Sequence, residues 1–366
     1  MRRSLSLLAA AMFGGAVAFA APVAAQEDGV AGPDFTTATY GGTTLWVGGG
    51  VQFLSLPDVR FIGKGPPGDF RRQKNLEGDF WDLGVAGGGG IETALGYWGD
   101  MRVSGAVKGF FANVETDDRT NCRTATCTIV DPAFGEDGFG PPVLTTKADR
   151  DADYWGGQIE FKFARAEPVH VKPDFYRNDY FIAGADIRGI DQDIRLRGHL
   201  GGAPIYTYKE TLDTTYYGGY IGIGGEYSFG FIPFIGPALK NVGGVYDRLG
   251  LRTFISARAG LYSAETDYDG RFAFQFIPYN SRISQSDDEL AFIGSISLET
   301  RKQLGTRSSL SLWTDYEFIS SVPEMRYNNG AGRPTRIEDD SVFASRTMIR
   351  LNIGLGPTQL YEEPLR

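Results

Sequence analysis

Two cysteines stand close together in a polar stretch and define the first candidate chemistry of this chain. Cys122 and Cys127 lie in the segment NCRTATC, and the chain holds no other cysteine. Such a pair forms either a disulfide or part of a metal site. Both histidines of the chain, His170 and His199, lie far from the pair in sequence. Because zinc sites need histidine or further cysteines as ligands, we expect a disulfide and no metal.

A histidine with carboxylates is the second candidate, since that combination supports general acid–base hydrolysis. His199 precedes Glu210 and Asp213, and acidic pairs occur at 117–118, 287–288 and 339–340. No motif spacing joins the histidine to these carboxylates, and the chain has no GxSxG elbow. The glycine run GVAGGGG at 84–90 lacks the Lys-Ser or Lys-Thr of a phosphate loop. Solvated loop charges are the favoured interpretation, so no catalytic residue and no cofactor is assigned.

Many other charged residues recur with a period of two. In RLGLRTFISARAGLYSAETD, residues 248–267, Leu251, Ile255 and Leu261 share one face of an extended chain, whereas Arg252 and Arg258 share the other. A half-exposed strand of a soluble sheet alternates in the same way. The significance of the pattern therefore depends on whether the whole chain repeats it.

Ten segments repeat this alternation, and several exceed the ~5–6 residues of a typical globular strand. A tilted membrane strand needs ~9–11 residues. The polar faces mix both charges with Ser and Gly, as a crowded interior requires, and aromatic residues gather near the segment ends, as in lipid-facing barrels. The segments are 43–56, 77–95, 100–117, 152–164, 179–197, 211–229, 248–268, 289–303, 308–321 and 341–355; the aromatic residues are Trp46, Trp81, Tyr97, Trp98, Trp155, Tyr180, Tyr216, Tyr217, Tyr227 and Phe229.

The N-terminus has the three parts of a secretory signal peptide. Arg2 and Arg3 precede an Ala-rich apolar stretch, and small residues before Gln26 predict cleavage after Ala25. We expect a signal peptide at 1–25, a periplasmic segment at 26–42, a barrel at 43–356 and a periplasmic tail at 357–366. The net charge of −9 argues against nucleic acid as a partner.

Together, the signal peptide, the ten segments and the last strand SRTMIRLNIGLG resemble the small outer-membrane β-barrel proteins of Gram-negative bacteria, a porin-like class. The resemblance covers nearly the whole mature chain and implies an all-β, transmembrane, antiparallel up-and-down barrel of about ten strands. Twelve strands is the alternative, because the inner connections 165–178 and 230–247 are long. It also implies outer-membrane lipid, lipopolysaccharide and the barrel-assembly machinery as partners; the oligomeric state stays open. Outer loops are expected at 57–76, 118–151, 198–210, 269–288 and 322–340.

With the polar faces inward, charges of both signs nearly cancel inside the barrel, as buried charges require. Ten strands with long charged side chains predict a plugged or very narrow lumen. We expect an envelope scaffold, a surface-interaction protein or a narrow porin-like channel. A surface enzyme, an omptin-like protease or a lipid-modifying enzyme with its site at the extracellular rim, is the alternative. The predicted lumen network comprises Glu160, Lys162, Asp186, Arg188, Glu226, Arg252, Arg258, Glu299, Arg301, Asp315, Glu317, Arg346 and Arg350.

Overall fold

The computed structural model describes residues 42–57, 62–64, 82–122, 127–131, 135–139, 144–165, 169–172, 175–227, 251–305, 307–326 and 336–355. The expected signal peptide and the tail 357–366 lie outside these ranges, so both stay predictions. No helix within the described ranges is long and apolar enough to cross a membrane.

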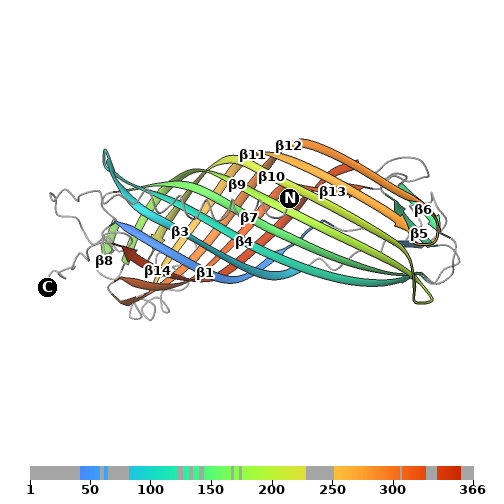
Figure 1. The fold of residues 1–366 in the computed structure, drawn as a ribbon. Coiled ribbons are helices and arrows are strands. Elements are labelled where there is room, and N and C mark those ends of the chain that lie inside the picture. The colour runs from blue at the N-terminus through green and yellow to red at the C-terminus, as the bar shows by residue number, and fades with distance from the viewer. Residues whose placement is uncertain are drawn as a thin grey trace.

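Ten long antiparallel strands form a closed ring, which confirms the expected barrel and its strand number (Figure 1). In ring order they are β1 (Thr43–Leu54), β3 (Asp82–Trp98), β4 (Met101–Cys122), β7 (Leu144–Arg165), β9 (Phe175–Leu200), β10 (Ala203–Tyr227), β11 (Leu251–Phe274), β12 (Asn280–Gly305), β13 (Ser308–Arg326) and β14 (Arg336–Leu355).

The ring closes where the first strand meets the last. β1 pairs with β14 over its whole length, from Thr43 opposite Leu355 to Leu54 opposite Ala344. Around the rest of the ring, each long strand pairs with the next long strand in the chain. Short strands lie between some of these long strands in the sequence. We call the end where β1 begins and β14 ends the proximal end, and the opposite end the distal end.

Outward side chains form an apolar belt around the proximal part of the barrel. Each of the ten barrel strands contributes large exposed hydrophobic residues. An apolar surface of this extent is unfavourable in contact with water. We define the apolar belt as Leu45, Val47, Val51, Phe53, Leu83, Val85, Val107, Phe111, Ile159, Phe161, Phe181, Ile221, Ile223, Leu261, Leu290, Phe292, Ile296, Leu298, Leu310, Leu312, Tyr316, Phe343, Ile349, Leu351, Ile353 and Leu355.

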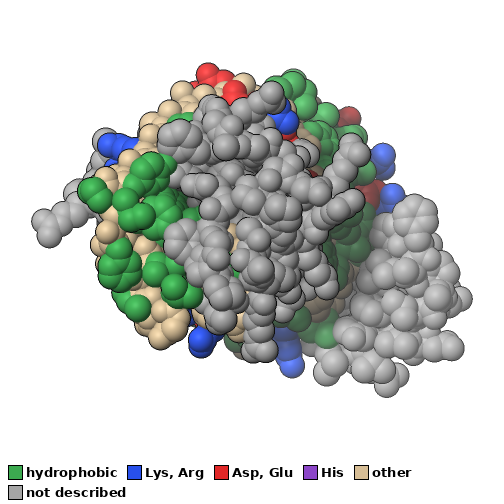
Figure 2. Space-filling model, turned by 90° about the vertical axis from the view of Figure 1, so that its right-hand side faces the viewer, with side chains coloured by type: hydrophobic (Ala, Val, Ile, Leu, Met, Phe, Trp, Pro, Cys, Tyr) green, Lys and Arg blue, Asp and Glu red, His purple; other side chains and the backbone are tan. Residues whose placement is uncertain are grey.

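The strands continue well past the belt at the distal end. On β4 the outward row changes from Phe111 to Glu115, Asp117 and Arg119, so the distal wall is charged outside. Figure 2 looks onto this end and shows hydrophobic side chains on the flank of the barrel, with basic and acidic groups beside them.

Four expected outer loops are wrong over much of their length. Segments 118–151, 198–210, 269–288 and 322–340 contain strand residues of β4, β7, β9, β10, β11, β12, β13 and β14. β9 and β10 are joined by a two-residue turn, Gly201 and Gly202, with φ of 57° and 89°, a region that glycine enters without strain. The distal strands lack an apolar outward row, so their sequence reads as polar loop.

A small antiparallel sheet sits at the distal end, formed by β2 (Ile62–Lys64), β5 (Cys127–Asp131) and β6 (Gly135–Phe139). The disulfide between Cys122 at the end of β4 and Cys127 at the start of β5 ties this sheet to the barrel. The disulfide prediction is thus confirmed. At the proximal end, the connection 165–178 contains β8 (Val169–Lys172), which pairs with β9; the connection 230–247 lies outside the described residues.

The aromatic girdle holds for only some of the expected residues. Tyr97 and Trp98 are 67% exposed at the proximal edge of the belt, and Tyr217 is 46% exposed at its distal edge. Trp46 and Tyr216 are buried, so their assignment to the girdle is wrong: both point into the lumen. Trp81 and Phe229 lie outside the described residues.

Candidate functional site: the filled lumen

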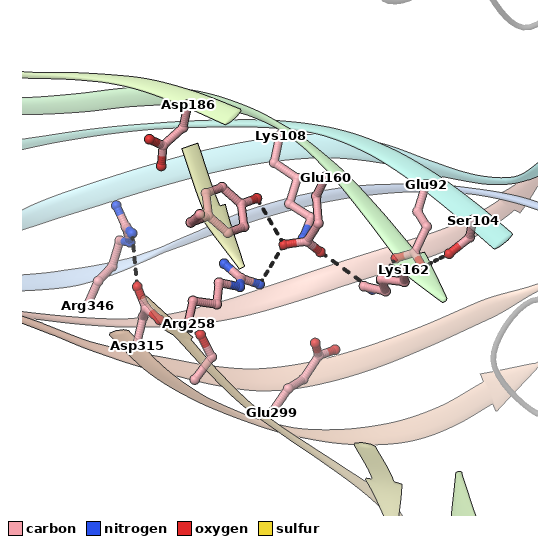
Figure 3. A network of polar contacts seen from close by, with 12 residues as sticks. Glu92, Ser104, Lys108, Glu160, Lys162, Asp186, Arg258, Glu299, Asp315 and Arg346 are labelled. Carbon is pink, nitrogen blue, oxygen red and sulfur yellow. Dashed lines mark hydrogen bonds and ion pairs between the residues drawn. The ribbon is translucent and has the colours of Figure 1, made fainter. Parts of the chain in front are cut away.

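The charged side chains of the lumen meet around Glu160 of β7, which is fully buried (Figure 3). Its carboxylate accepts from Lys108 Nζ at 2.6 Å and lies 2.9 Å from Arg258 Nη2. The Tyr220 hydroxyl donates to it at 3.2 Å, and Lys162 Nζ lies 4.0 Å away. A buried carboxylate needs several such donors to offset the loss of water.

A second group crosses the barrel from wall to wall. The Tyr154 hydroxyl of β7 and the Arg188 guanidinium of β9 both donate to the carboxylate of Glu317 on β13. Four strands separate β7 from β13 in either direction around the ring, so this contact spans the lumen. Arg188 also donates to Asp186 at 2.6 Å, which gives each of these buried charges an opposite partner.

Two arginines of β14 are stacked between aromatic rings. The Arg346 guanidinium carbon lies 3.5 Å from the Phe110 ring centre and 5.2 Å from that of Trp313. Arg350 lies 3.6 Å from Trp313 and 4.2 Å from Trp46. By these contacts the order along the inner wall is Phe110, Arg346, Trp313, Arg350 and Trp46, an alternation of rings and cations in which each contact is stabilising.

The proximal mouth carries further pairs. Lys162 donates to Glu92 at 2.9 and 3.0 Å, and Ser104 donates to Glu92 at 3.3 Å. Arg301 donates to Glu299 at 2.9 Å. Together with the groups above, these contacts make up the ionic layer, which lies inside the apolar belt.

The remaining predicted lumen residues also lie at this mouth. Glu226 is buried and lines a cavity there. Arg252 lies opposite Arg301 in the pairing of β11 with β12.

An apolar plug covers the ionic layer on its distal side. All ten barrel strands contribute to it, at the level of the distal edge of the apolar belt, so it forms a layer across the lumen. We define the apolar plug as Leu54, Leu56, Ala86, Ala112, Val114, Ala152, Tyr154, Ile190, Tyr216, Tyr262, Ala264, Ala291, Ile293, Ile319, Val322, Val342 and Ala344, with Phe110 packed against it.

A second apolar cluster fills the lumen farther toward the distal end. It includes the disulfide and the aromatic residues Tyr206, Tyr208, Tyr268 and Phe272. The lumen is therefore polar at the level of the apolar belt. Farther toward the distal end it is packed with apolar side chains, like the core of a soluble domain.

Two adjoining cavities lie in the ionic layer. The smaller, about 50 Å³, lies beside the plug, and Phe110 is part of its wall. The larger, about 110 Å³, is lined by proximal strand ends, including Thr44, Arg102 and Asn352. Trp46, Lys108, Arg258, Trp313 and Arg350 line both cavities, so the two meet at these side chains.

The structure does not assemble the histidine–carboxylate site. His199 lies opposite Pro204, whereas Asp213 lies opposite Asp191, eight residues from His199 along β9 and so about 27 Å away. Glu210 is buried inside the barrel, where the Tyr208 hydroxyl donates to it. Within the described ranges, no group of three or more His, Cys, Asp or Glu is placed to hold a metal ion.

Carboxylates form a row outside the distal wall, next to the belt. Asp153, Asp191, Asp213 and Asp267 lie directly opposite one another across β7, β9, β10 and β11. Loss of solvation, followed by the negative charges of Asp191, Asp193 and Asp267, raises the pKa of Asp213 to about 6. The pKa of Asp191 is also raised, first by loss of solvation. Like charges directly opposite one another oppose strand pairing.

The uncharged part of the lumen was not predicted from the sequence. Tyr154, Tyr216, Tyr262 and the stacked Trp313 are inward residues that hold the charged groups apart or cap them. One signal was present: on β12 the inward row runs Ala291, Ile293, Ser295, Ser297 and Glu299, and thus changes from apolar to charged. The position of such a change along each strand marks the level of the plug.

The closed ring, the outward belt and the polar lumen inside it define the class of this protein: an up-and-down β-barrel of the outer-membrane type. No family model and no curated protein matches the chain.

Solved barrels are similar to it in structure. They include the outer membrane protease OmpT from Escherichia coli (8% identity, 85% of this chain and 96% of that chain covered, TM-score 0.44) and the translocator domain of the autotransporter NalP from Neisseria meningitidis (11%, 86% and 89%, TM-score 0.31). A Pseudomonas aeruginosa FadL homologue is a third (9%, 88% and 93%, TM-score 0.22). At these values the likeness says nothing about activity.

Proposed function

We propose that this protein is a plugged outer-membrane barrel that serves the envelope as a scaffold and surface-contact protein rather than as a solute channel. The observation that carries the proposal is the apolar plug, to which all ten strands contribute. Charged solutes crossing such a layer lose their hydration without gaining partners. The bridge from Tyr154 and Arg188 to Glu317 obstructs the lumen on the proximal side of the plug.

The apolar belt supports the membrane location. A closed ring leaves no unpaired strand edge to face lipid, which is the condition for strands that span a bilayer. We place the belt in the outer membrane, with the start of β1 and the end of β14 at the periplasmic side. The distal parts of the strands then extend outside the cell. Their charged outer wall then faces lipopolysaccharide and water, and insertion requires the barrel-assembly machinery.

The rim enzyme receives less support from the geometry. Asp213 lies opposite Asp191, eight residues from His199 along β9. Glu210 is buried inside the barrel, on the opposite side of the wall from His199. A general base has to lie within hydrogen-bond reach of its partner.

Conductance measurement in planar bilayers tests the proposal. We expect the folded protein to insert and to give no stable single-channel current. The double variant Tyr154→Ala/Tyr216→Ala removes two large side chains of the plug, and it should show a small current if it folds. A steady current through the native protein would favour the narrow channel and contradict the plug. Heat-modifiable migration on a detergent gel and co-fractionation with outer membranes check folding and location.

A further inference from the structure

Within the part of the chain that the structure describes, two buried arginines of the ionic layer have no hydrogen-bonded carboxylate. Arg346 and Arg350 are 5% and 9% exposed. The nearest carboxylate oxygens lie at 3.6 Å, on Asp315, and at 3.9 Å, on Glu299, beyond hydrogen-bond length. Both carboxylates have other donors: Ser297 donates to Asp315, and Arg301 donates to Glu299.

The unsatisfied atoms are specific ones. Among the described residues, Nε and Nη1 of Arg346 and Nε of Arg350 are buried and have no hydrogen-bond partner. The aromatic stack holds the flat faces of both guanidinium groups, but ring faces do not accept from N–H groups that point along the guanidinium plane. Arginine recognises oxyanions through such N–H edges, although these three atoms are buried and have to turn toward the cavity to reach an ion there.

Both arginines line the smaller cavity, of about 50 Å³. One water needs ~10–15 Å³ on the same measure, so the cavity has room for about three to five oxygen atoms. Five cationic side chains line it against three carboxylates. Glu160, fully buried behind the wall, is paired with Lys108 and Arg258. Arg346 and Arg350 are thus the lining cations with only long ion pairs, to Asp315 and Glu299, among the described residues.

We propose that this cavity binds a small tetrahedral oxyanion, such as inorganic phosphate or sulfate, between Arg346 and Arg350. Water alone would fill the space but leave each buried guanidinium with a single long ion pair, 3.6 Å from Arg346 to Asp315 and 3.9 Å from Arg350 to Glu299, a costly state. A four-oxygen ion matches the volume, supplies negative charge and brings acceptors to the part of the wall that Arg346 and Arg350 form. Figure 3 shows Arg346 and Arg258 reaching into this part of the lumen from different strands.

Access comes from the proximal end. The larger cavity adjoins the smaller one, and Arg102, Lys162 and Arg301 are among its lining residues. Cationic walls concentrate anions in a narrow passage. Because the apolar plug lies beyond the smaller cavity, the path is blind, and the bound ion returns by the way it entered. The site does not depend on whether the plug blocks all conduction.

Titration of the native protein, folded in detergent, with phosphate or sulfate at constant ionic strength tests this site. Trp46 and Trp313 pack against Arg350, so tryptophan fluorescence should change saturably with either ion and not with chloride. Arg346→Gln and Arg350→Gln should each weaken binding at least tenfold. Arg282→Gln, a distal exterior variant whose side chain is 61% exposed, should bind as the native protein does.

Three results would overturn the assignment. The first is no saturable fluorescence change up to about 10 mM ion, ten times the ~1 mM dissociation constant that marks weak binding. The second is an unaltered affinity in both arginine variants. The third is glycerol phosphate binding as tightly as inorganic phosphate, which would place the ion in the larger cavity. Should the variants not fold, crystals of the native protein grown with selenate decide. An anomalous peak between Arg346 and Arg350 is expected, and no peak there contradicts the proposal.

Discussion

The Tyr154 hydroxyl donates to the Glu317 carboxylate across the full width of the barrel. One residue lies on β7 and the other on β13, with four strands between them on each side of the ring. Arg188 of β9 joins the same carboxylate. Contacts of this kind hold opposite walls of the barrel in a fixed relative position, as a packed core does in a soluble domain.

The first prediction concerns this carboxylate. Glu317→Gln leaves Arg188 with one buried counter-charge, Asp186, in place of two. We expect the free energy of unfolding to fall by about 3 kcal/mol, as when one partner of a buried pair is removed. Urea unfolding in lipid vesicles, followed by tryptophan fluorescence, measures it. Glu115→Gln, on the exposed face of β4, is the control and should change stability by less than ~0.5 kcal/mol. Equal effects of both variants would refute the bridging role.

A second prediction concerns the seam between β1 and β14. A Cβ on Gly50 would lie 1.9 Å from the Thr347 carbonyl oxygen, a distance that backbone cannot tolerate, whereas one on Gly49 meets its nearest atom, the Ala86 oxygen, at 3.8 Å. Gly50→Ala should therefore reduce the fraction of protein that reaches the heat-modifiable form, and Gly49→Ala should not. A detergent gel of boiled and unboiled samples measures both. Similar yields would show that the seam accommodates the methyl group.

Removal of the disulfide is the third test. Cys122 and Cys127 are five positions apart, so the cross-link restricts a short loop and contributes about 2 kcal/mol on the chain-entropy account. The double variant Cys122→Ser/Cys127→Ser should lose that stability locally, in the small distal sheet. We expect faster trypsin cleavage near Arg123 and an unchanged heat-modifiable shift. Loss of the shift would mean that the disulfide is needed for the barrel itself.

The fourth prediction uses the row of carboxylates. Because the pKa of Asp213 is raised to about 6, the folded state holds its proton at a pH where the unfolded chain, with an ordinary Asp pKa near ~3.9, has lost it. The contribution of Asp213 to stability is therefore largest below pH ~4 and is lost as the pH rises through about 6.

Asp213→Asn should remove most of this pH dependence and stabilise the protein at pH ~7. Asp213 is exposed, so solvent screening limits the gain to about 1 kcal/mol. Unfolding curves at several pH values measure the difference between variant and native protein. Asp117→Asn, outside this row on β4, serves as control. A stability gap that does not change with pH would contradict the shifted pKa.

Local sequence pattern predicted the wall of the barrel well and its contents poorly. Alternation located all ten strands, since a strand buried on one side has to repeat its residue types every second position. It failed where both faces are polar or both are mixed, and so read much of 198–210 and 269–288 as loop. It also placed Trp46 and Tyr216 with the outward aromatic residues, because a tyrosine or tryptophan near a strand end looks the same whichever way it points.

The charges illustrate the same division. The sequence showed that residues such as Glu160 and Arg258 occupy polar faces, and their near-balance predicted a crowded lumen. It did not show that Arg258 reaches Glu160 from β11, or that Arg346 and Arg350 are stacked on rings of β1, β4 and β13. Apart from β13, which directly precedes β14, those partners lie on strands that are distant in the chain.

The sequence by itself determined the ten strands where they carry the apolar belt, and which of their faces is apolar, because both follow from the types of neighbouring residues. Only the tertiary structure decided which charges pair, where the apolar plug lies and which arginines remain without a carboxylate. The physical reason is that closure of the ring sets the stagger between strands, and the stagger brings particular inward residues to a common level.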